Sequence, residues 1–131
     1  MEEKKYKMVY SIEGYTPKQG DIIWLNFNPS AGREIQKKRP ALVISSNAYN
    51  GSTGFILVCP ISTSKKERPG FVSLTQEHSI RGKVNAMQIK GFDFLAKERE
   101  VRFVEKATAT EVGMVAQIVG HIFSFDSLLS E

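Results

Sequence analysis

Hydrophobic residues along this chain fall mostly into short runs, separated by polar segments that contain Gly, Pro, Asn or Ser. Short runs rich in β-branched and aromatic side chains are typical of strands. Six segments of this kind predict strands, at 22–27, 41–45, 55–61, 71–74, 83–89 and 101–104. Between them, residues 47–54 are expected to form a polar connection and residues 92–99 a helical turn.

The hydrophobic pattern changes period near the C-terminus. Apolar residues at spacings of three and four predict one amphipathic helix there: Val112, Val115, Ile118, Val119, Ile122 and Phe123. Thr110 is expected to be its N-cap, with Glu111 in the first turn. Gly113 and Gly120 weaken the helix by roughly 1 kcal/mol each relative to Ala.

These elements predict a mainly β fold with one C-terminal α-helix. Short strands with long polar loops favour a small, strongly curved β-barrel capped by the helix. The length of 131 residues suits a single domain. Residues 1–18 lack clean periodicity and contain a Thr16-Pro17 break, so we expect an N-terminal extension followed by a domain over residues 19–131.

The composition narrows the class further. With 41% hydrophobic and 24% charged residues, the chain resembles an ordinary globular protein. No apolar run approaches the ~18 residues of a membrane span, and no signal region is visible, so a soluble, cytoplasmic protein is expected. The single cysteine, Cys59, excludes an internal disulfide and is expected to be a buried hydrophobe. His78 and His121 lack Glu or Cys partners at ligand spacing, so no metal or other cofactor is expected.

The distribution of charge points to an anionic partner. The 18 Lys and Arg residues exceed the 14 Asp and Glu residues, giving a net charge of +4. The excess is concentrated in two predicted loops, the first with Arg33, Lys37, Lys38 and Arg39 and the second with Lys65, Lys66 and Arg68. Two basic loops on one small domain suit a polyanion, and we expect the functional site where they meet.

The general catalytic motifs are absent from the sequence: a phosphate-binding Gly-rich loop, a dinucleotide fingerprint, a nucleophile elbow and a zinc-protease helix. The distinctive polar segments, 32–40 and 60–66, each adjoin the end of a predicted strand. An Arg at a strand end can clamp a phosphate through two parallel hydrogen bonds, and nearby hydroxyls and a carboxylate can assist. Trp24 and Phe27 are expected to be core residues more than platforms for stacked bases.

Several of these segments, in this order and spacing, resemble the MazF/PemK (Kid) group of toxin endoribonucleases. The resemblance covers roughly residues 19 to 122. It is carried by Gly20-Asp21-Ile22-Ile23-Trp24, Asn28-Pro29, Gly32-Arg33-Glu34, Lys38-Arg39-Pro40-Ala41-Leu42-Val43-Ile44-Ser45, Asn50, Thr53-Gly54, Pro60-Ile61-Ser62-Thr63, Arg68-Pro69 and Ala86-Met87-Gln88-Ile89.

The resemblance implies an SH3-like barrel that forms a homodimer, cleaves single-stranded RNA without a metal and is silenced by a MazE/PemI-like antitoxin. It makes Arg39 a catalytic residue, matches the catalytic hydroxyl to Ser62 or the adjacent Thr63, and matches the family's acidic residue to Glu34. Gln88 matches a family Gln. Asn85 stands where Kid-type members carry Arg, and Met87 replaces their Asp, so the version with Arg39 and a hydroxyl is favoured.

The chemistry of RNA cleavage agrees with these assignments. Attack by a 2′-hydroxyl on the adjacent phosphorus gives a 2′,3′-cyclic phosphate and a free 5′-hydroxyl. Arg39 suits stabilisation of charge on the phosphate oxygens. A guanidinium is a poor base because its reference pKa lies above ~12, so Glu34 is the better proton acceptor. Other residues are expected to bind RNA: Arg33, Lys37, Lys38, Lys65, Lys66, Asn85 and Gln88.

Two other functions remain open at this point. One is a nucleic-acid-binding barrel without catalysis, because one fold can host many functions. The other is a gyrase poison of the CcdB type. The combination of Arg39 with Ser62 and Thr63 separates the endoribonuclease from the gyrase poison, which does not need these residues, and an RNA-cleavage assay separates it from the binding barrel.

Overall fold

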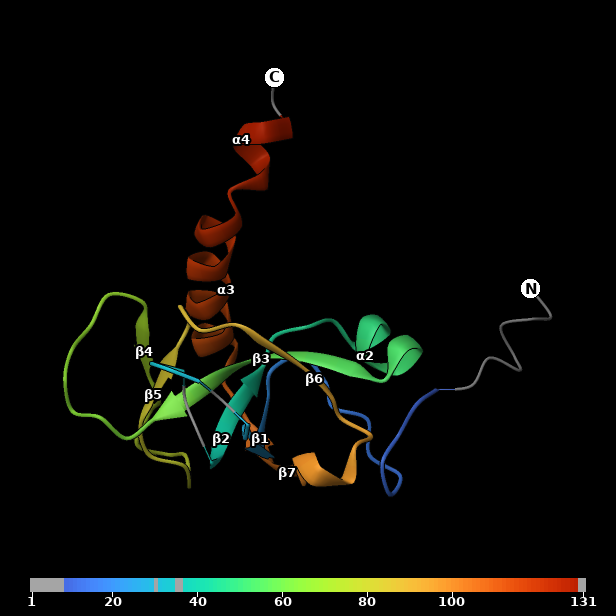
Figure 1. Cartoon of the computed structure of the whole chain (residues 1–131). Coiled ribbons are helices and arrows are strands. Elements are labelled where there is room, and N and C mark those ends of the chain that lie inside the picture. Colours follow the sequence, from blue (N-terminus) through green and yellow to red (C-terminus); the bar gives the residue numbers. More distant parts are fainter. Residues whose placement is uncertain (1–8, 30, 35–36, 130–131) are drawn as a thin grey trace.

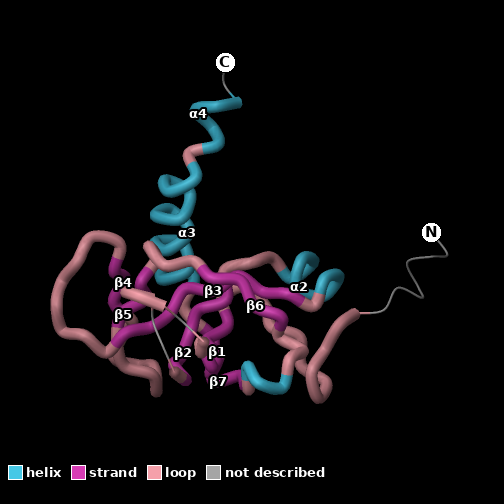
Figure 2. Tube along the Cα trace, viewed as in Figure 1, coloured by secondary structure: helices cyan, strands magenta, loops and turns pink. Residues whose placement is uncertain are grey.

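The computed structural model of the protein describes residues 9–29, 31–34 and 37–129. Residues 1–8 of the predicted extension and residues 35–36 of the first basic loop lie outside these described residues. The strands are β1 (Asp21–Asn26), β2 (Lys38–Val43), β3 (Phe55–Ser62), β4 (Phe71–Ser73), β5 (Lys83–Asn85), β6 (Lys90–Asp93) and β7 (Arg102–Lys106). The helices are α2 (Asn47–Thr53), the 3-10 turn η1 (Lys97–Arg99), α3 (Ala109–Phe123) and α4 (Phe125–Leu129) (Figure 1, Figure 2).

The strands form one antiparallel sheet in the order β4-β5-β3-β2-β1-β7. β3 is long enough to pair with two further strands on its other side, with β6 along its first half and β5 at its end. The mainly β class with a C-terminal helix is therefore confirmed. Within the described residues β4 and β7 end the order without pairing to each other, so the barrel is left open instead of closed.

Both faces of the sheet are packed. On one face, which we call the Phe27 face, a core cluster forms around Ile23, Leu25, Phe27 and Ala41. On the opposite face, the Val115 face, Ile22 and Leu42 join Val115 of α3. The alternation of side chains along each strand explains this division, because odd residues of β1 point one way and even residues the other. Phe27 and Cys59 are fully buried, as predicted, and burial raises the pKa of the Cys59 thiol to about 12.

Two strand boundaries differ from the prediction by three or more residues. β2 begins at Lys38, three residues earlier than predicted, because Lys38 and Arg39 pair with Asn26 and Leu25 of β1. β5 ends at Asn85 instead of running to residue 89, since the Asn85 side chain accepts the Met87 N–H at 3.1 Å and turns the chain.

The segment predicted as irregular was assigned wrongly, and the one predicted as a helical turn was right only for its last residues, where η1 lies. The expected connection over 47–54 contains helix α2, which is capped by the Ser46 hydroxyl and ended by Gly54 in the left-handed region. The expected helical turn over 92–99 is the end of β6 followed by η1. β6 forms because Phe92 pairs with Ile56 and packs in the core.

The N-cap of α3 lies two residues before the predicted one, Thr110. The cap is Thr108, whose hydroxyl accepts the Glu111 N–H, while the Glu111 carboxylate accepts the Thr108 N–H. This reciprocal capping box satisfies two backbone donors, which Thr110 is not positioned to do. Only Glu111 and Val115 of α3 are buried, and the second half of the helix rises away from the sheet together with α4 (Figure 1).

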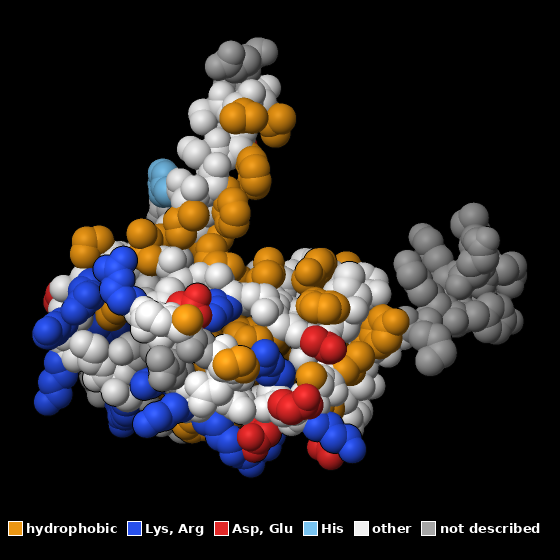
Figure 3. Space-filling view, in the orientation of Figure 1, with side chains coloured by type: hydrophobic (Ala, Val, Ile, Leu, Met, Phe, Trp, Pro, Cys, Tyr) orange, Lys and Arg blue, Asp and Glu red, His pale blue; other side chains and the backbone are white. Residues whose placement is uncertain are grey.

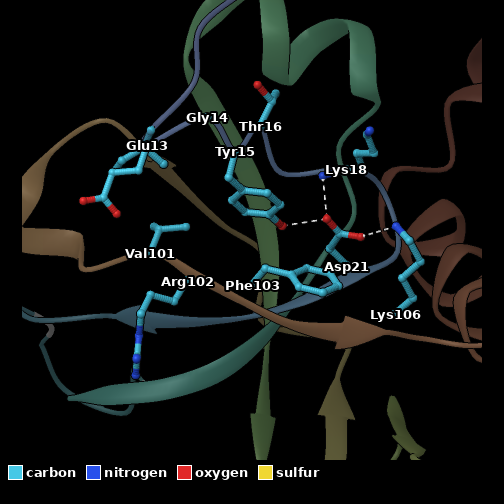
Figure 4. Close-up of a pocket in the computed structure, with 11 residues that line it drawn as sticks. Glu13, Gly14, Tyr15, Thr16, Lys18, Asp21, Val101, Arg102, Phe103 and Lys106 are labelled. Atoms are coloured by element: carbon cyan, nitrogen blue, oxygen red, sulfur yellow. Dashed lines mark hydrogen bonds and ion pairs between the residues drawn. The ribbon is translucent and has the colours of Figure 1, made fainter.

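The described part of the predicted extension, residues 9–18, packs on the domain. Ile12 and Tyr15 lie against the core of the Phe27 face. Buried Asp21 accepts hydrogen bonds from the Tyr15 hydroxyl at 2.6 Å and from the Lys18 N–H, and pairs with Lys106 at 2.9 Å (Figure 4). These groups line a hollow of about 650 Å³ between this segment and β7. No described helix has the length and apolar character needed to cross a membrane.

Candidate active site

Arg39 and Ser62 lie at the same end of two neighbouring strands. The register pairs Ala41 of β2 with Pro60 of β3. Continued by two residues, this register puts Arg39 opposite Ser62, the last residue of β3. Both side chains are half-buried, so each is held by its strand while remaining accessible. The structure therefore places the two residues that the sequence predicted as an Arg–hydroxyl pair at the same end of β2 and β3.

Three further polar residues share this face of the sheet. Arg39 pairs with Leu25 of the Phe27 face, and Ser62 lies four residues beyond Val58 of the same face. Opposite residues of paired strands share a face, so Lys83 joins Ser62 and Lys90 joins Val58. Asn85 follows Lys83 by two residues and points the same way. These five residues form the part of the Phe27 face that we call the rim. The rim carries a hydroxyl, an amide and three cationic side chains.

Glu34 reaches this rim from the loop between β1 and β2. Its Oε1 accepts a hydrogen bond from Lys90 Nζ at 3.0 Å and another from the Ala31 N–H at 3.0 Å. The pKa of the Glu34 carboxyl is lowered, first by the Ala31 hydrogen bond and then by the hydrogen bond and positive charge of Lys90. The carboxylate is exposed and ionised at neutral pH, and can accept a proton there.

The base of the β1–β2 loop is held by backbone contacts. The Lys37 N–H donates to the Asn28 side chain at 2.9 Å, and the Phe27 N–H donates to the Lys37 carbonyl at 2.9 Å. Arg99 of η1 donates to the Asn28 carbonyl at 2.6 Å and to the Asn26 carbonyl at 3.1 Å. This cross-link fixes where the first basic loop leaves the sheet, and with it the start of β2, the strand that holds Arg39.

Ser62 and Thr63 occupy different environments. Ser62 is paired with Lys83, and its hydroxyl accepts the Ser64 N–H at 3.1 Å. Thr63 lies beyond the strand, is exposed, and lines a hollow of about 350 Å³ next to β4 and β5. Because Thr63 has left the sheet, the strand register no longer directs it toward Arg39. The geometry favours Ser62 as the partner of Arg39.

The second basic loop runs from Thr63 to Gly70. In Figure 3, Lys and Arg side chains gather over this loop at the left and along the lower margin of the molecule. Lys65 and Lys66 are exposed, and Glu67 of the loop pairs with Lys83 of β5. Each basic loop is thus tied to a strand that pairs with β3, the first through Lys90 and the second through Lys83.

The other predicted RNA-binding residues are distributed around this rim. Arg33 and Lys37 are exposed on the first loop, and Asn85 and Gln88 are half-buried in and after β5. Lys38 is the exception, since it pairs with Asn26 and points to the face opposite Arg39. There it forms an ion pair with Glu100 at 2.6 Å, beside half-buried Trp24 in a hollow of about 590 Å³.

Sequence reasoning missed Lys83 and Lys90. Each is a single cation at the start of a short strand, without a neighbouring cluster or a spacing pattern that would mark it. Only the pairing of β5 and β6 with β3 carries these side chains to the site. Within the part of the chain that the structure describes, no group of three His, Cys, Asp or Glu side chains could hold a metal ion.

The fold and the site define a small β-sheet protein that presents cations, a hydroxyl and a carboxylate at one rim, an arrangement suited to a phosphodiester. The comparisons with known proteins specify this class. Residues 18–123 match the family model of the PemK-like, MazF-like toxin of type II toxin–antitoxin systems. The chain belongs to this family.

Characterised relatives and solved structures agree with the match. The chain is 38% identical over 86 residues to the endoribonuclease toxin MazF of Escherichia coli K12, covering 66% of this chain and 77% of that protein. The crystal structure of MazF from Deinococcus radiodurans superposes with a TM-score of 0.78 at 34% identity, over 84% of this chain and 98% of that one. A MazE–MazF complex from the same organism gives a TM-score of 0.73 at 34% identity, over 84% and 98% of the two chains.

Proposed function

We propose that this protein is a toxin endoribonuclease that cleaves single-stranded RNA, selects its sites by sequence and needs no metal. The observation that carries the proposal is that Arg39 and Ser62 lie at the same end of the neighbouring strands β2 and β3, where Lys83 pairs with Ser62. Its relatives named as endoribonucleases support the reaction class. We assign the reaction to attack of the 2′-hydroxyl on the adjacent phosphorus, which yields 2′,3′-cyclic phosphate and 5′-hydroxyl ends.

The residues at the rim have different roles in the proposed reaction. Arg39 donates hydrogen bonds to the non-bridging oxygens as negative charge develops on them. Ser62 holds the same phosphate, and Thr63 remains the alternative hydroxyl. Glu34 is the proton acceptor, because it is ionised at neutral pH. Its lowered pKa also makes it a weak base, so we expect a modest share of the rate to come from Glu34.

The RNA path follows the cations around this rim. The exposed cations Arg33, Lys37, Lys65 and Lys66 contact phosphates, and Lys38 extends the path at the margin. Asn85 and Gln88 offer amide groups to an unstacked base, the means by which single strands are read by sequence. We place the endoribonuclease domain at residues 19–131, consistent with the family match that starts at residue 18.

We further propose that the protein works in the cytoplasm as a homodimer and is inhibited by a cognate MazE/PemI-like antitoxin. The support for the antitoxin is the set of MazE–MazF complexes among the similar structures. An acidic, otherwise disordered antitoxin segment suits the cationic rim, where it would cover Arg39.

The test is incubation of the purified protein with a long single-stranded RNA in EDTA, followed by analysis of the fragment ends. We expect fragments with 5′-hydroxyl and cyclic phosphate ends from the parent, and a loss of about 10²–10³ in rate for Arg39→Ala. RNA that is bound but left intact would support the binding barrel instead. If the RNA stays intact and the protein inhibits DNA gyrase in a separate assay, the CcdB-type poison is supported instead.

A further inference from the structure

The connection between β4 and β5, residues 74–82, is fastened by two carboxylates from other elements. Glu111 of α3 accepts the Thr75 N–H at 2.8 Å. Glu105 of β7 accepts the N–H groups of Ser79 and Ile80, both at 3.0 Å. A surface connection of this length is ordinarily mobile, and these contacts tie it to the first turn of α3 and to the end strand of the sheet.

His78 joins the two carboxylates. Its Nε2 lies 2.7 Å from Glu111 Oε1, and its Nδ1 lies 3.5 Å from Glu105 Oε2. His78 is only 7% exposed and Glu111 only 3%. Burial acts to raise the pKa of Glu111, but hydrogen bonds from Thr108, Thr75 and His78 outweigh it and lower the pKa overall. The imidazole thus completes a buried polar cluster, and Glu111 serves it while also capping α3.

The connection leads directly to the proposed site. Gly82 ends it in the left-handed region, and a Cβ at this position would collide with the Ser62 carbonyl oxygen. The next residue, Lys83, pairs with Ser62. Only two residue pairs join β5 to β3, so this hairpin depends on contacts elsewhere to keep its position. The hydrogen bonds that the connection makes to Glu111 and Glu105 are such contacts.

We propose that His78 is a positioning residue for RNA cleavage. By linking the β4–β5 connection to α3 and β7, it holds Gly82 against Ser62 and keeps Lys83 and Asn85 aligned beside Arg39. This inference rests on the proposed function, because it assigns His78 a role in that reaction. His78 touches neither the RNA nor the reacting atoms; it acts through the β4–β5 hairpin.

The test compares two amides at position 78. The amide nitrogen of His78→Gln can reach the place of Nε2 and keep the bond to Glu111. The side chain in His78→Asn is shorter, so its amide nitrogen cannot reach that place and the bond to Glu111 is lost. We expect His78→Gln to cleave RNA within about threefold of the parent. His78→Asn should lose about 10- to 100-fold in kcat, with KM little changed, because misplacement at a reacting centre costs rate while the phosphate contacts persist. His121→Ala, an exposed His on α3, is the matched control and should behave as the parent.

A second measurement separates positioning from stability. All variants are assayed well below their unfolding temperatures, and amide hydrogen exchange is followed in β5. Exchange at residues 83–85 should accelerate in His78→Asn and not in His78→Gln, while exchange in β1 and β2 stays unchanged. Equal kcat values for the two amides, or a β5 that exchanges alike in both, would overturn the proposal. If the parent cleaves no RNA, the proposed function fails, while the exchange experiment still decides whether His78 holds the hairpin.

Discussion

At the scale of single residues, the choice between Ser62 and Thr63 is open to a direct test. Ser62 is fixed by pairing with Lys83, whereas Thr63 stands beyond the strand. We expect Ser62→Ala to lower kcat by at least tenfold and Thr63→Val to change it by less than threefold, measured on one RNA substrate. A larger loss from Thr63→Val would make Thr63 the catalytic hydroxyl.

The contact between Glu34 and Lys90 predicts a pH effect. Lys90 lowers the pKa of Glu34, so replacing it with Met lets that pKa rise toward its ordinary value of about 4.5. The carboxylate is then protonated at a higher pH, so the acid limb of the kcat–pH profile should shift to higher pH. The Ala31 hydrogen bond remains and limits the shift. Lys66→Met, in the second basic loop, is the control that should leave the limb in place; an unmoved limb in both variants would remove Glu34 as the base.

How far sequence alone reaches differs among these residues. Arg39, Ser62 and Glu34 were identified through family resemblance, and the strand register then places the first two at the same end of β2 and β3. Lys83, Lys90 and His78 could not be found in this way, because their importance comes from pairing and packing between segments far apart in the chain. His78 and Glu111 are 33 residues apart and meet only when α3 packs beside the β4–β5 connection.

At the scale of elements, the start of α3 gives a second test. Thr108 forms the capping box with Glu111, while Thr110 lies inside the first turn. We expect Thr108→Ala to lower the free energy of unfolding by about 1 kcal/mol in urea titrations, and Thr110→Ala by much less. Equal losses would show that the cap bond contributes nothing of its own.

The elements that sequence patterns missed share a physical cause. α2 contains Asn50-Gly51, a pair typical of turns, yet buried Asn50 bonds to the Ser45 hydroxyl and the Pro17 carbonyl. Those tertiary bonds and the caps at both ends override the local preference. β6 likewise forms because β3 offers it an unpaired edge, which no local pattern reveals. The central strands and α3 were predictable because their hydrophobic periodicity is set by the core they enter.

At the scale of the whole molecule, one apolar surface lacks a covering within the described residues. The arm formed by α3 and α4 carries Ile122, Phe123 and Leu128, which are 43%, 50% and 74% exposed. Phe55 and Leu57 of β3 are also exposed, and by alternation with Cys59 they lie on the Val115 face, the side that α3 covers. Hydrophobic side chains line the side of the arm above the body of the molecule (Figure 3). We call the exposed surface of Phe55 and Leu57 the shoulder, and we expect the arm of a second molecule to pack against it.

This shape predicts a two-fold homodimer in which each arm packs on the shoulder of its partner. An isologous interface buries both apolar surfaces at once, and patches of this kind on small domains mark interaction sites. We expect light scattering at micromolar concentration to give about twice the chain mass of 14.7 kDa. Leu57→Glu on the shoulder and Phe123→Glu on the arm should each yield monomers, because each places a charge in the same interface. Met87→Gln is the control: Met87 is 57% exposed but lies after β5, outside arm and shoulder. A parent that stays monomeric, or a Leu57→Glu variant that still dimerises, would exclude this arrangement and require another partner for the arm.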